Sequence, residues 1–126
     1  MSERRSIDLP GWSHTAAVPL GCRVGNIVFS SRISGRDPAT DRVPGDPGEQ
    51  ARLLFENVAA FMHAAGGTLE NIGHVTVLLS DPAYRGAFEQ GWLGAFPDER
   101  SRPARHVQEG PLRGGVCFQV ELIAVL

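Results

Sequence analysis

The chain has 126 residues, 42% hydrophobic and 21% charged, which is enough for one domain with a modest hydrophobic core. Its formal net charge of −2 excludes a global positive field that would attract nucleic acid or an anionic membrane. All 12 basic residues are arginine, and the absence of lysine excludes a lysine Schiff base and a phosphate-binding loop of the G-K-[ST] kind.

The two ends of the chain and its cysteines give further bounds. The N-terminal stretch lacks the apolar run of a signal peptide, and no segment is long and apolar enough to span a bilayer. Cys22 and Cys117 lie far apart and show neither metal-ligand nor disulfide-framework spacing. We therefore expect a reduced, cytoplasmic protein with a single domain over residues 1–126, in which residues 1–13 are loosely ordered.

The first predicted elements are two short strands within residues 22–31, with Gly25-Asn26 as the turn or bulge between them. A long loop rich in glycine, proline and aspartate follows over residues 34–50.

A helix is then clearly marked. Asp46 is a good N-cap, Pro47 suits the first helical position, and Glu49 can complete a capping box. Gly66-Gly67 supplies the stop, because glycine accepts the left-handed conformation. Between them, apolar residues recur at helical spacing and form one stripe: Leu54, Val58, Phe61 and Ala65.

The second half repeats this pattern and then ends in strands. Residues 72–81 alternate as a strand, and Asp81-Pro82 opens a second helix over residues 82–96. On that helix Phe88 and Trp92 are four residues apart and are expected in the core, with Tyr84 one turn before them. Two strands complete the chain, at about 104–109 and 115–125, joined by a turn at 113–115.

The predicted order is therefore β-β-α-β-α-β-β, an α+β domain with two helices on one face of a mixed sheet. The other face of such a sheet is rich in valine, leucine and isoleucine, which a small monomer does not leave open to water. We therefore expect a homo-oligomer.

Several of these strings, in this order, resemble the Rid family (also called YjgF; reactive intermediate deaminase A and its relatives). The resemblance covers about residues 14 to 126. The matching stretches are V-G-N-I-V-F-S-S at 24–31, D-P-A-T at 37–40, E-Q…A-A-G-G-T-L within 49–69, I-G-H-V-T-V-L-L-S-D at 72–81, S-R-P-A-R at 101–105 and E-L-I-A-V-L at 121–126.

The resemblance implies a chorismate-mutase-like fold, assembled as a homotrimer around a central barrel with clefts between subunits. It also implies cofactor-independent hydrolysis of small reactive imines and enamines to keto acids and ammonia, without a metal. In this family the arginine of the P-A-R string grips the substrate carboxylate, which assigns that role to Arg105. From the residues alone, Arg105 is either such an anchor or a solvated arginine at a strand edge.

Three positions depart from the better-known deaminases. Val107 stands where a cysteine is common, and Val18 where a tyrosine precedes the first strand. Gln119 stands where the glutamate that activates water is usual, and an amide cannot take a proton at neutral pH. Glu121 lies two residues further on the same face of the strand, either as a substitute base or as a hydrogen-bonding residue at the trimer interface.

Two further residues are candidates for the cleft. His14 has a side chain suited to proton transfer and by resemblance borders the cleft of the neighbouring subunit; the alternative is a surface histidine in an N-terminal loop. Arg32 replaces the glycine of the usual S-G-Q string, so it either joins Arg105 in binding a dicarboxylate or points outward to an acidic residue such as Asp37. The four histidines lack ligand spacing, so we expect no zinc site.

Two other functions compete with the deaminase. The changes at Val107 and Gln119 are also compatible with a non-catalytic module that binds small carboxylates. A specialised deaminase of an aminated intermediate in an aromatic degradation pathway is a second possibility. A ribonuclease or translation inhibitor is disfavoured by the acidic charge balance, the absence of lysine and the lack of an aromatic platform for stacking bases.

Overall fold

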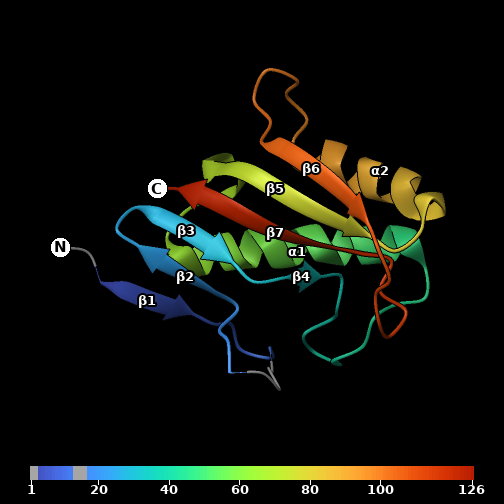
Figure 1. Ribbon diagram of the computed structural model, residues 1–126, viewed down its shortest axis with the longest axis horizontal. Helices are drawn as coiled ribbons and strands as arrows, with labels where there is room; N and C mark the ends of the chain where they lie inside the picture. Colours follow the sequence, from blue (N-terminus) through green and yellow to red (C-terminus); the bar gives the residue numbers. More distant parts are fainter. Residues whose placement is uncertain (1–2, 13–16) are drawn as a thin grey trace.

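The computed structural model describes residues 3–12 and 17–126, which form a mixed sheet with both α-helices on one side (Figure 1). The strands are β1 (Arg4–Ile7), β2 (Gly21–Val24), β3 (Ile27–Ser30), β4 (Ile33–Ser34), β5 (Ile72–Leu79), β6 (Ala104–Glu109) and β7 (Phe118–Val125). The helices are α1 (Pro47–Ala65) and α2 (Arg85–Ala95). Two 3-10 turns complete the set: η1 (Leu69–Asn71) precedes β5, and η2 (Pro82–Tyr84) precedes α2.

The sheet has the order β1-β2-β3-β7-β5-β6, and β4 also pairs with β7. All pairs are antiparallel except β5 and β6, which are parallel. A parallel pair needs a crossover connection, and α2 supplies it. The predicted α+β class, with a mixed sheet and two helices on one face, is confirmed.

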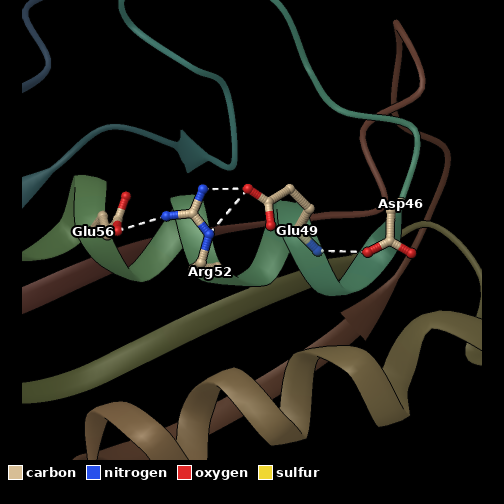
Figure 2. A network of polar contacts seen from close by, with 4 residues as sticks. All are labelled: Asp46, Glu49, Arg52 and Glu56. Carbon is tan, nitrogen blue, oxygen red and sulfur yellow. Dashed lines mark hydrogen bonds and ion pairs between the residues drawn. The ribbon is translucent and has the colours of Figure 1, made fainter.

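The N-terminus of α1 matches the sequence prediction at Asp46 and Pro47 but not at Glu49 (Figure 2). The Asp46 carboxylate accepts a hydrogen bond of 2.9 Å from the backbone N–H of Glu49, and Pro47 occupies the first turn. The Glu49 carboxylate turns to Arg52 instead of completing a capping box, and Arg52 also binds Glu56 at 2.7 Å. The Arg52 guanidinium holds the pKa of Glu49 below its usual value.

The C-terminus of α1 and its buried face also match the prediction. Gly66 has φ of 95° and closes the helix in the left-handed conformation. The predicted apolar stripe is buried against the sheet, together with the inward side chains of β5 and β7. The members of this core with 2% exposure or less include Leu54, Val58, Phe61, Met62, Val77, Leu79, Phe118, Val120 and Ala124.

Other boundaries differ from the prediction. The second helix is divided, because Asp81 caps the short turn η2 and the α-helix begins only at Arg85. The last strand begins at Phe118 and not at residue 115, since Gly114 and Gly115 both have positive φ, 66° and 75°, and belong to the turn.

The N-terminal segment is more ordered than its sequence indicates. Residues 4–7 form β1, which pairs antiparallel with β2 and buries Ile7. Its polar sequence, Arg-Arg-Ser-Ile, carries little strand signal; the pairing partner fixes its conformation instead.

The sheet face opposite the helices is open. Ile27 and Phe29 of β3 lie opposite Val125 and Ile123 of β7, and all four are between 38% and 51% exposed. Together we call Ile27, Phe29, Ile123 and Val125 the open-face patch. Within the described residues, no helix combines the length and the apolar character needed to cross a membrane.

Candidate functional site

Arg105 lies on β6, the strand at one edge of the sheet. In the parallel register it is the partner of Val75 on β5, and Val107 is the partner of Val77. Partnered residues point to the same face, and both valines of β5 are buried under the helices. Arg105 therefore points to the helix-covered side of the sheet, at its edge.

Helix α2 meets the guanidinium of Arg105 with three side chains. Nη1 of Arg105 donates to Oε1 of Glu89 over 2.5 Å. The guanidinium carbon lies 4.8 Å from the ring centre of Trp92 and 5.7 Å from that of Phe88. The Arg105 side chain is 18% exposed and that of Glu89 39%, so this cation lies in a partly desolvated, aromatic corner.

The helical spacing explains how α2 builds this corner. Phe88 and Trp92 are four residues apart, with ring centres separated by 6.2 Å, and both are buried as predicted. Phe88 packs further down against Phe118 of β7, at 5.4 Å. Glu89 follows Phe88 and contacts Arg105 on the edge strand β6.

The geometry leaves Arg105 with unused donors. Within the described residues, Nη1 is the atom of this guanidinium with a hydrogen-bond partner, and neither Nε nor Nη2 has one. Nε and Nη2 form one side of the guanidinium fork, the geometry that binds both oxygens of a carboxylate. Val107 is half-buried and lies two residues further along β6, on the same face of the sheet as Arg105.

Gln119 and Glu121 lie on the other side of the sheet. They are the β7 partners of Leu78 and Thr76, whose side chains alternate with the buried valines of β5. The exposed Arg32 lies beside them over a shallow depression on the open face. Within one chain, the structure therefore does not bring these three side chains to Arg105.

Of the remaining candidate residues, Val18 is 51% exposed, and His14 lies outside the described residues. His106 follows Arg105 on β6 and faces the other side of the sheet, and His63 lies in the last turn of α1. Arg32 makes no ion pair with Asp37 in the described structure, where the Asp37 carboxylate caps the backbone of Ala39 instead. In the same residues, no cluster of three or more histidine, cysteine or acidic side chains could hold a metal ion.

Glu89 is the residue that the sequence did not indicate. An exposed glutamate on an amphipathic helix is ordinary, and its neighbour Phe88 carried the visible helical pattern. The informative signal would have been the parallel pairing of β5 with β6, which turns Arg105 toward α2. A pairing register of this kind is a long-range property that local patterning does not specify.

Comparison with known proteins identifies the family of the chain. The family model described as Endoribonuclease L-PSP matches residues 12–126. The chain belongs to this family, the YjgF/RidA/RutC family. The resemblance found in the sequence is thereby confirmed.

Its relatives include proteins named as deaminases. TdcF of Escherichia coli (strain K12), named a reactive intermediate deaminase, is 33% identical over 107 residues, which are 83% of each chain. The 3-aminoacrylate deaminase RutC of Acinetobacter baylyi is 32% identical over 104 residues, 81% of each chain.

Solved structures share the fold over nearly the whole chain. RidA from the Antarctic bacterium Psychrobacter sp. matches with a TM-score of 0.88 at 26% identity, over 97% of this chain and 99% of its own. E. coli TdcF with bound serine also has a TM-score of 0.88, at 27% identity, over 97% and 98% of the two chains. The expected fold is thus confirmed.

Proposed function

We propose that this protein hydrolyses the C=N bond of small imine or enamine acids, without a cofactor. One water adds to the imine carbon, the C–N bond then breaks, and the products are a 2-keto acid and ammonia. Membership of the family and the deaminase names of relatives at 32–33% identity support this reaction class. An imine carbon is already electrophilic, so the protein mainly has to fix the substrate and position one water.

Arg105 is the observation that carries the proposal. It stands in the P-A-R string and is held in place by Glu89, Phe88 and Trp92, and no described residue occupies its Nε and Nη2 donors, which can therefore bind a substrate carboxylate. A guanidinium that is already desolvated and oriented loses less entropy when it binds a ligand. The structurally similar E. coli TdcF has a crystal structure with bound serine, a small molecule that carries a carboxylate.

A homotrimer completes the proposed site. Gln119, Glu121 and Arg32 lie on the open face, whereas Arg105 lies at the edge of the helix-covered face. A cleft between copies joins the edge of one chain to the open face of the next, and in it we place Val107, Val18 and His14 as further site residues. There Gln119 holds the attacking water, and Glu121 or His14 takes its proton.

The trimer has its own test, based on the open-face patch. Phe29→Glu places a charge in this patch, whereas Leu93→Glu, on α2, changes an exposed leucine on the opposite side of the molecule. We expect the wild type and Leu93→Glu to be trimers by light scattering coupled to gel filtration, and Phe29→Glu to dissociate. A monomeric wild type would refute the proposed assembly.

A carboxylate-binding module without catalysis is the second candidate. Gln119 favours it, because an amide at the position of the usual glutamate removes one proton acceptor. In this alternative Arg105 keeps its role as anchor and the bound acid is released unchanged.

Imine trapping separates the two candidates. An amino-acid oxidase generates imines from neutral, acidic and aromatic amino acids in the presence of semicarbazide, and semicarbazone formation is followed with and without the protein. We expect the wild type to suppress trapping, Arg105→Ala to lose this effect, and Arg100→Ala, an exposed arginine on the nearby loop, to retain it. The best imine also tests the aromatic-pathway variant. Full trapping with every imine, together with carboxylate binding that depends on Arg105, would favour the binding module.

A further inference from the structure

The carboxylate of Glu89 is an unexpected neighbour for an arginine that anchors an anion. It contacts Nη1 of Arg105 at 2.5 Å and partly neutralises the charge that would attract a substrate carboxylate. The aromatic side chains cover one face of the same guanidinium, with Trp92 at 4.8 Å. An incoming ligand is therefore left with the Nε–Nη2 side of Arg105, next to a fixed negative charge.

Oε2 of Glu89 has no hydrogen-bond partner among the described residues. The carboxylate can thus bind Arg105 through one oxygen and still accept a hydrogen bond from a ligand through the other. The corner consequently presents two complementary features at its rim, paired N–H donors and an anionic acceptor. A ligand that matches both carries a carboxylate and a positively charged N–H group a few bonds apart.

We propose that Glu89 is a specificity-determining residue, which makes the Arg105 corner selective for zwitterions. The inference rests on the proposed function, in which Arg105 holds the carboxylate. The protonated imine of a 2-keto acid is such a zwitterion: its carboxylate binds the Nε–Nη2 side of Arg105, and its iminium N–H group donates to Glu89.

This selectivity has a consequence for turnover. The 2-keto acid product retains the carboxylate but has lost the N–H group. Its only interaction with Glu89 is therefore the repulsion between the two carboxylates. Glu89 therefore favours the substrate over the product at the same anchor. It also disfavours an imine with a second carboxylate near this corner, and Arg32 lies on the opposite face of the sheet and does not offset that repulsion within the chain.

The test uses matched ligands that do not react: L-alanine, a zwitterion, and pyruvate, an anion with the same carbon skeleton. Their dissociation constants are measured by NMR titration of the intact wild type, Glu89→Gln and Arg105→Ala. Glu89→Gln keeps the shape of the side chain and a hydrogen-bond acceptor but removes the charge. Glu70→Gln, an exposed glutamate in η1, is the matched control.

We expect the ratio of the pyruvate to the alanine dissociation constant to fall by about tenfold or more in Glu89→Gln, with pyruvate binding tighter and alanine weaker. Glu70→Gln should leave the ratio unchanged, and Arg105→Ala should weaken both ligands. A purely structural role of Glu89 would change both ligands in the same direction, and that result would overturn the inference. An unchanged ratio in Glu89→Gln would overturn it as well. The proposed function fails separately, if neither ligand depends on Arg105.

Discussion

The side chain of Gln50 connects helix α1 to the backbone around Pro44 and to the turn before β7. It is fully buried on α1 and makes three hydrogen bonds to distant backbone: its Nε2 donates to Pro44 at 2.7 Å and to Gly115 at 3.0 Å, and its Oε1 accepts from Cys117 N at 2.9 Å. We predict that Gln50→Leu destabilises the protein by about 2–4 kcal/mol. The buried N–H of Cys117 loses its partner outright, whereas the carbonyl of the exposed Gly115 can turn to water.

The assay is equilibrium urea unfolding at one fixed protein concentration, because association couples stability to concentration. The matched control is Gln90→Leu, an exposed glutamine on α2, which should change stability by no more than about 0.5 kcal/mol. Gln50→Glu is a second variant of the same size. It puts an acceptor against two carbonyls and should cost at least as much as leucine. A loss below about 1 kcal/mol for Gln50→Leu would refute the reasoning.

Three further predictions concern other parts of the chain. Gly35→Ala should destabilise by about 1–3 kcal/mol or more in the same unfolding assay, because its Cβ would lie 2.1 Å from the backbone oxygen of Gln50, whereas Gly45→Ala, with open space around it, should be nearly neutral. Glu49 has a lowered pKa, so its ion pair stabilises the fold above the ordinary value of 4.5; the stability difference between wild type and Glu49→Gln should vanish as pH falls through the folded pKa, and a difference that persists in acid would contradict this. Burial raises the pKa of Cys117, so at pH 8 iodoacetamide should modify it more slowly than the other cysteine by mass spectrometry, and equal rates would count against that burial.

The elements with local signals could be predicted from the sequence. The ends of α1 are fixed by Asp46 and Gly66, whose side-chain cap and left-handed backbone act within a few residues of themselves. The strand at 104–109 and the buried pair Phe88 and Trp92 follow from short-range alternation and helical spacing. β1 could not be predicted, because its polar residues become a strand only through pairing with β2.

The environment of the candidate site was harder to derive, for the same physical reason. The family strings indicate Arg105, but the face to which it points depends on the register of β6 against β5. Once Arg105 is the partner of Val75, it must lie over α2, and Glu89 becomes its ion-pair partner. Nothing near Arg105 in the sequence specifies a glutamate sixteen residues earlier.

The alternation of the strands also constrains how catalysis can be organised. β6 is an edge strand, so Arg105 lies at a border of the sheet that a second molecule can approach. Gln119 and Glu121 face the open side together with the open-face patch, whose exposed apolar side chains are the basis of the proposed assembly. In that proposed assembly, the contact that buries the patch also brings Gln119 and Glu121 to the arginine of another copy. We therefore expect Phe29→Glu, which dissociates the assembly, to remove deaminase activity while the contact between Arg105 and Glu89 within each chain stays intact. Monomers with full activity would contradict this and would show that the residues around Arg105 are sufficient for the reaction.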